Sequence, residues 1–347
     1  MLSFAPTWMP GLVQVFPLVL ALTLLLARRL RAHPGTFYAL VGGVVAIASW
    51  ANVAMAVMGD DAHAIVVAFD AAVEQAGQSN PVASLVLALC TSSYAGVSIY
   101  LIVMFVGALP RTPAVRRLLS VRSELSILGG IIIAGHVLRV FDFPSNFSDP
   151  MFSLVWGDAA CAWVFVATAV IGPALTVAFV VPWVLSFPAV RRRMNPHTWK
   201  RVQRAFCYPF MALMLAQGFC LAVGHALIAY PWDGVMAQRM LSVPQEFLGT
   251  FAQQVATAWI YALLAVAYAA LRIGKALSDR RARAAREVAR ASRRQARDAS
   301  PQAPAGGAQG VARPSGDAPY ASPSALEDAA EPAAEDAAGL AAEDALA

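Results

Sequence analysis

The sequence predicts an all-α protein, a polytopic transmembrane helical bundle of about seven spans with a disordered tail. Of its 347 residues, 59% are hydrophobic and only 14% are charged, whereas charged residues make up about a quarter of a typical soluble domain. Apolar runs long enough to cross a bilayer, which takes about 20 residues, recur along the chain. Basic residues gather in every second connection between these runs. We therefore expect a multi-pass protein of the cell membrane.

Seven apolar runs are predicted to be membrane spans. Each is about as long as a helix that crosses the hydrocarbon core of a bilayer. Their approximate limits are residues 8–27, 36–58, 81–109, 124–141, 159–187, 205–230 and 251–271.

The charges of the connections predict the orientation of the spans. The connections after the first, third and fifth spans hold 13 basic residues, and the other three hold only Arg239. Because short cytoplasmic loops carry an excess of Lys and Arg, we expect the amino terminus outside and the carboxyl terminus in the cytoplasm. The basic residues behind the net charge of +5 are then explained by membrane topology. No nucleic-acid partner is therefore expected. The 13 residues are Arg28, Arg29, Arg31, Arg111, Arg116, Arg117, Arg122, Arg191, Arg192, Arg193, Lys200, Arg201 and Arg204.

Several kinds of site are not indicated by the sequence. The four cysteines form no CxxC pair, so no disulfide framework, zinc site or iron–sulfur cluster follows from their spacing. The chain has no glycine-rich nucleotide motif, no nucleophile constellation and no HExxH motif. If the protein takes part in an enzyme, we expect it to be the membrane electron-transfer component of an oxidoreductase. Its electron donor and acceptor would then be other proteins or a quinone.

Composition divides the chain into four parts. Residues 1–80 hold two spans and an outer loop, and residues 81–271 form the membrane core. Residues 272–299 are basic, and their arginines recur at intervals of three and four, which predicts one basic stripe on a helix. This stripe either lies on anionic membrane lipid or stays in water. Residues 300–347, rich in Ala, Pro and Gly with eight acids, are predicted to be disordered.

His136 lies in the apolar run 122–139, where an ionisable side chain is costly and is a candidate for function. Gly129 is seven residues earlier and Arg139 three residues later, so all three share one helix face. A b-type haem would use such a face, with an axial imidazole, room for the macrocycle and a partner for a propionate. The alternative is a tight glycine contact between helices beside a packed histidine.

Two segments together resemble the ferric reductase-like transmembrane family, which includes the haem-binding membrane subunits of methionine sulfoxide reductase systems. The first, residues 109–140, is a basic loop that leads into a helix with one histidine, His136. In the second, Trp199, Lys200, Gln203 and Arg204 match the family's W-K/R-x-x-H/Q-R pattern before another helix. The resemblance covers roughly residues 85–271 and implies an integral membrane protein that binds haem b and transfers electrons.

The second metal ligand is left open by the sequence. The family's second histidine is expected about 14 residues past Gln203, where this chain has Gln217. His225 lies eight residues further along, about 12 Å at a rise of 1.5 Å per residue. Counted from the cytoplasmic ends, Gln217 matches the depth of His136, but counted from the outer ends His225 does.

Two functions follow from these residues. In the first, His136 and His225 ligate one haem b, Arg139 meets a propionate, and electrons pass to an acceptor outside the membrane. In the second, the family fold is kept without haem, and the protein is a membrane anchor or structural partner subunit. For the second function, Gln217 marks a lost ligand position.

Overall fold

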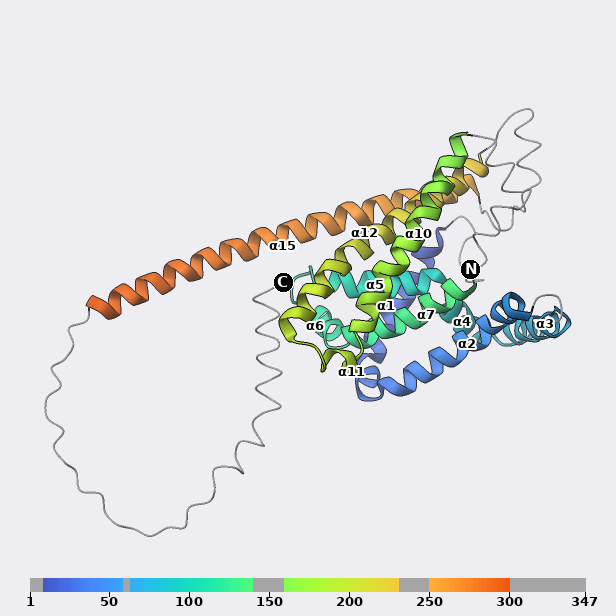
Figure 1. Ribbon diagram of the computed structural model, residues 1–347, viewed down its shortest axis with the longest axis horizontal. Coiled ribbons are helices and arrows are strands. Elements are labelled where there is room, and N and C mark those ends of the chain that lie inside the picture. Colours follow the sequence, from blue (N-terminus) through green and yellow to red (C-terminus); the bar gives the residue numbers. More distant parts are fainter. Residues whose placement is uncertain (1–8, 59–62, 140–158, 231–249, 300–347) are drawn as a thin grey trace, which may run out of the picture. The chain divides into compact units, whose positions relative to one another are not determined.

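The computed structural model describes residues 9–58, 63–139, 159–230 and 250–299, and within these ranges the chain forms helices and no strand. Figure 1 shows these helices, coloured along the chain from blue at the amino terminus to red at the carboxyl terminus. The prediction of an all-α protein is therefore confirmed for the described part. The helices are α1 (Gly11–Ala32), α2 (Pro34–Met58), α3 (His63–Ser79), α4 (Pro81–Thr91), α5 (Ser93–Val106), α6 (Pro113–Leu119), α7 (Arg122–Arg139), α10 (Ala159–Leu185), α11 (Pro188–Arg191), α12 (Pro196–Ile228) and α15 (Phe251–Ala299).

The described helices are those of a multi-pass membrane protein. Four of them are long and apolar enough to cross a bilayer, and the number rises to six if each of two bent pairs is one span. The bent pairs are α4 with α5, at 64°, and α6 with α7, at 62°. The number of seven spans and their orientation stay predictions.

Ser92 divides the predicted span 81–109 into two helices. Its backbone N–H donates to the carbonyl oxygen of Ala88 and ends α4. Its side-chain oxygen accepts from the backbone N–H of Tyr94, 3.2 Å away, and caps the start of α5. The predicted span 81–109 is therefore made of two helices, because a serine competes for backbone groups and favours a cap.

The helix α12 begins nine residues earlier than the predicted span 205–230. Asn195 accepts the backbone N–H of His197 at 2.9 Å, and Pro196 occupies the first turn, where its missing N–H costs nothing. α15 continues past Leu271 as helix to Ala299, over the residues 272–299 that were predicted to form a basic helix. The helix extends beyond the apolar run at both places, since capping and propensity, rather than hydropathy, set helix ends.

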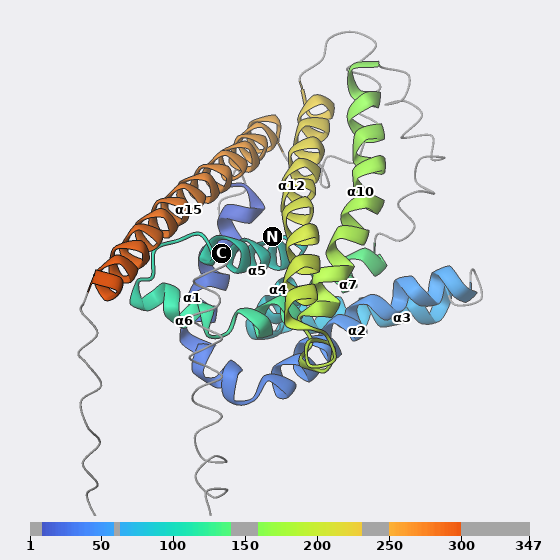
Figure 2. The ribbon, with the colours of Figure 1, turned by 60° about the vertical axis from the view of Figure 1, so that its left-hand side comes forward.

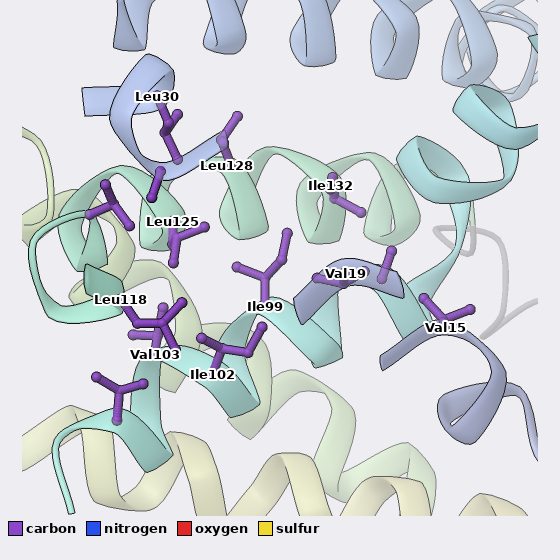
Figure 3. Packing of buried hydrophobic residues seen from close by; sticks show 14 of the residues in the cluster. Val15, Val19, Leu30, Ile99, Ile102, Val103, Leu118, Leu125, Leu128 and Ile132 are labelled. Atoms are coloured by element: carbon purple, nitrogen blue, oxygen red, sulfur yellow. The ribbon is translucent and has the colours of Figure 1, made fainter. Parts of the chain in front are cut away.

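The core of the first unit is built around α5. Ten of its 14 residues are buried, as expected for a helix that is apolar on every side. One apolar cluster joins α5 to α1, α2, α4, α6 and α7, and Figure 3 shows its central residues, among them Ile99, Leu125 and Ile132. A second cluster joins α5 to α10, α12 and the first part of α15 through residues such as Tyr100, Met211 and Tyr261.

The other contacts between helices belong to the same two clusters. α10 and α12 lie side by side along their length in Figure 2, and α2 packs on α7. Residues on both sides of position 80, where we placed a boundary, therefore contribute to one core.

The chain divides into two compact units, Met1–Ala269 and Ala270–Ala347, so that α15 contributes to both. The predicted tail 300–347 lies outside the described residues.

Candidate functional site

Gly129 lies on a buried face of α7 that packs directly against α5. A Cβ atom at this position would lie 2.9 Å from Cγ2 of Ile99 and 3.2 Å from Cε2 of Tyr100. Such distances are shorter than side-chain carbons normally allow. Gly129 is therefore a close contact between helices, and the surface beside it is occupied by two side chains of α5.

His136 lies near the end of α7, beside a second glycine contact. A Cβ atom at Gly135 would meet Val45 of α2, and the carbonyl oxygen of Gly135 accepts the hydroxyl of Ser49 at 3.3 Å. His136 itself is partly buried. Arg139 is the last residue of α7, and its side chain lies outside the described part. The pairing of Arg139 with a haem propionate thus stays a prediction.

Gln217 and His225 both lie on α12, and both are partly buried. The amide nitrogen of Gln217 lies 4.0 Å from the position of a Cβ atom at Gly172 of α10. Its Oε1 atom is buried and accepts no hydrogen bond. A buried carbonyl oxygen that accepts no hydrogen bond costs free energy. Gln217 is therefore the polar side chain in this region that would gain most from a hydrogen-bond donor.

Hydrogen bonds join the start of α7 to the end of α10. The hydroxyl of Ser123 donates to the carbonyl oxygen of Ser186 at 3.0 Å, and the Ser126 and Ser186 hydroxyls are 2.9 Å apart. The start of α7 and the end of α10 therefore share one level. His136 is 13 residues beyond Ser123, which places it at most about 20 Å from that level.

The helix α12, which holds Gln217 and His225, packs along α10. Gly172 precedes Ser186 by 14 residues and so lies about 21 Å from the same level. Gln217 lies beside Gly172. His225 lies eight residues further along α12, about 12 Å beyond Gln217. The choice between Gln217 and His225 as the partner of His136 stays a prediction.

A haem held by His136 and His225 stays a prediction. Two axial imidazoles must reach one metal ion, and imidazole nitrogens bind metals at about 2 Å. Ile133 of α7, three residues before His136, packs against the second cluster, which contains Met211 and Leu215 of α12.

Metal-binding groups do not gather elsewhere in the described part of the chain. Within those residues, no three His, Cys, Asp or Glu side chains come close enough to hold an ion. Cys90, Cys207 and Cys220 are free thiols. The described residues thus offer no metal site beyond the histidines that the sequence indicated.

A polar network at the junction of α5, α7 and α10 was not anticipated from the sequence. The hydroxyl of Tyr100 donates to the carbonyl oxygen of Ser126 at 3.0 Å, and the indole N–H of Trp183 donates to that of Ile127 at 3.3 Å. The hydroxyl of Ser186 also donates to the carbonyl oxygen of Pro182 at 2.8 Å. The signal was available, because Ser and Trp within apolar spans often bond to neighbouring helices.

Trp199, a residue of the family-like pattern, anchors the start of α12 to α10. Its indole N–H donates to the carbonyl oxygen of Leu185 at 3.1 Å. The guanidinium carbon of Arg191 lies 4.9 Å from the centre of its ring, a cation–π geometry. Trp199 therefore makes structural contacts, and these need no cofactor.

Comparison with known proteins gives one distant likeness. The chain is 26% identical over 191 residues, 55% of its length, to a protein of Treponema pallidum (strain Nichols) described as uncharacterized. The matched region spans 45% of that protein. No family model matches the chain, and no solved structure matches it.

Proposed function

We propose that the protein is a multi-pass membrane subunit that serves as an anchor or structural partner for another membrane protein. It keeps the arrangement of helices expected from the resemblance without a haem between His136 and His225. The observation that supports this proposal is the packing of Ile99 and Tyr100 against Gly129, since the face that a macrocycle would need carries helix contacts.

The proposal includes seven spans, with the amino terminus outside and the carboxyl terminus in the cytoplasm. The spans are α1, α2, the α4–α5 pair, α7, α10, α12 and the apolar part of α15. The support is the distribution of Lys and Arg, 13 in one set of connections and one in the other. This orientation places the basic residues that follow Leu271 on the cytoplasmic side.

An absorption spectrum and a mass measurement test the proposed function together. The protein is extracted with mild detergent from membranes that were supplied with haem precursor. We expect no haem bands, and we expect light scattering to give a particle heavier than the 36.7 kDa chain because it contains a second polypeptide. A sharp reduced α band that both His136→Ala and His225→Ala abolish would overturn the proposal. So would a lone chain without a partner.

A b-type haem that passes electrons from a donor protein or quinone to an outer acceptor is the second candidate. One observation favours it: Oε1 of Gln217, at the position where the family's second ligand is expected, is buried without a donor. Here His136 would hold the iron, and electron transfer is the chemistry the haem would supply. In this case His136→Ala and Gln217→Ala should both change the reduced α band, and His225→Ala should leave it intact. Arg139→Ala should keep the haem but lower its midpoint potential, because a nearby positive charge favours the reduced iron.

A further inference from the structure

Basic residues of the second compact unit fall on one face of α15. Residues 272–297 hold ten Lys and Arg, and at about 100° per residue eight of them lie within an arc of about 100°. We call these eight the basic stripe. They are Arg272, Lys275, Arg283, Arg286, Arg290, Arg293, Arg294 and Arg297. Arg280 and Arg281 lie outside the stripe.

The stripe arises from a repeat of 11 residues. Arg272, Arg283 and Arg294 are 11 residues apart, and a second series at Lys275, Arg286 and Arg297 has the same spacing. An 11-residue repeat corresponds to about 3.67 residues per turn, so the stripe drifts little along a straight helix. The basic residues therefore form a line about 38 Å long on one face.

Most described side chains of this unit are open to solvent, whereas Arg272, Lys275 and Asp279 are partly buried. Every residue from Arg280 to Ser292 is exposed, including Arg286 and Arg290 of the stripe. The apolar residues Ile273, Leu277 and Val288 lie on another face and are 61%, 48% and 67% exposed. Asp279 is the one acid on the stripe face, between Lys275 and Arg283, and it reduces the charge of the stripe only in part.

A line of cations is complementary to an anionic surface of the same length. Lys and Arg clusters that directly follow a membrane span favour anionic lipid, and each residue near the surface contributes about 1 kcal/mol. The apolar part of α15 runs directly into the stripe without a break in the helix. In the seven-span arrangement proposed above, on which this inference rests, the stripe therefore begins where the chain leaves the membrane. A helix that stayed in water would not need its basic residues aligned on one face.

We propose that residues 272–297 lie along the anionic headgroups of the same membrane, with the basic stripe toward the lipid. The helix must then bend near the membrane surface. Gly274 suits this bend, because no atom lies within 4 Å of a Cβ at that position, and glycine lacks the side chain that stiffens a helix. The acidic segment 300–347 of the same chain, which carries eight acids and one arginine, would compete with the lipid for the basic stripe.

The distance of Ser292 from the membrane tests the proposal. Ser292 is exposed and lies 20 residues past Arg272, so it is about 30 Å from the membrane if the helix projects and about 10 Å away if the helix lies flat. The full chain carries a dye on Ser292→Cys, with the four native cysteines replaced by alanine. It is placed in nanodiscs with an acceptor dye on the lipid headgroups. We expect strong energy transfer with phosphatidylglycerol present and weak transfer in phosphatidylcholine alone.

Two charge-matched variants separate the stripe from net charge. Arg286→Glu with Arg290→Glu reverses two stripe residues and should reduce the transfer to the value in phosphatidylcholine. Arg280→Glu with Arg281→Glu changes the net charge equally but lies off the stripe, and should keep the transfer high. Each protein is first checked for a monodisperse peak, which α15 variants outside the core should retain.

Three results would overturn the proposal. The first is equal transfer in the two lipids, and the second is an equal loss in the two double variants. The third is weak transfer in anionic discs that becomes strong only when the chain is truncated after Ala299, which would identify the acidic segment as the occupant. None of these results depends on whether haem or a partner subunit is present, so the proposed function is tested separately.

Discussion

Trp183 of α10 covers Gly130 of α7 and donates its indole N–H to the carbonyl oxygen of Ile127 at 3.3 Å. A Cβ atom at Gly130 would fall on the indole ring. The same ring stacks on Phe179, with centroids 5.5 Å apart. The ring is held on both sides, so it has little freedom to move away from a larger residue at position 130.

Gly130→Ala should therefore destabilise the bundle, by about 1–3 kcal/mol, the usual cost of overpacking. The control is Gly43→Ala in α2, where no atom lies within 4 Å of the new Cβ. It should leave stability unchanged or raise it by up to about 1 kcal/mol, since alanine favours helix. The measurement is the temperature at which the detergent-purified protein loses its monodisperse peak. Equal losses in the two variants would contradict the packing described here.

Tyr100 contributes both a hydrogen bond and aromatic contacts to the centre of the first unit. Its hydroxyl bonds to Ser126, and its ring meets Phe179 and Phe210 edge to face, with centroids 5.9 and 4.9 Å apart. Tyr100→Phe should cost about 1 kcal/mol, because the ring contacts survive. Tyr100→Leu should cost clearly more, since each aromatic pair is worth about 0.5–1.5 kcal/mol. The measurement is the thermal stability of the two variants. An equal loss of stability in both would argue against the ring contacts.

The sequence was sufficient to predict the helical class and the membrane character of this chain, because hydropathy over 20 residues depends on no tertiary contact. It was also sufficient to find the stripe on the second part of α15. It did not predict the break at Ser92, where one serine serves two helix ends. Nor did it predict that Gly129 packs on Ile99, because a glycine in a membrane helix marks a close approach without naming the partner.

The position of His136 relative to Gln217 and His225 could not be predicted for a related reason. Each estimate of depth depended on where a helix begins, and α12 begins at Pro196 rather than at Ala205. Spacing within one helix is fixed by its rise, whereas the offset between two helices is a tertiary property.

Ser92 should contribute to stability through its cap on α5. Ser92→Ala removes the acceptor for the backbone N–H of Tyr94, and losing an N-cap side chain typically costs about 1 kcal/mol. Ser93→Ala is the matched control, because the Ser93 side chain makes no hydrogen bond in the described part of the structure. The thermal assay used for Gly130 serves here as well. A larger loss for Ser93 than for Ser92 would show that the break between α4 and α5 has another origin.

The orientation of the chain can be measured without reference to any function. The arrangement of basic connections predicts that a reporter fused at the carboxyl end reports cytoplasm. Cysteines placed at Asp60, Asp149 and Asp233, one in each acidic connection, should react with an impermeant thiol reagent in intact cells. Cysteines at Arg117 and Arg192, in basic connections, should react only after the membrane is permeabilised. Protection of Asp149 in intact cells would reverse the assigned side of α7 and α10, and the carboxyl-terminal stripe would then face the outer leaflet.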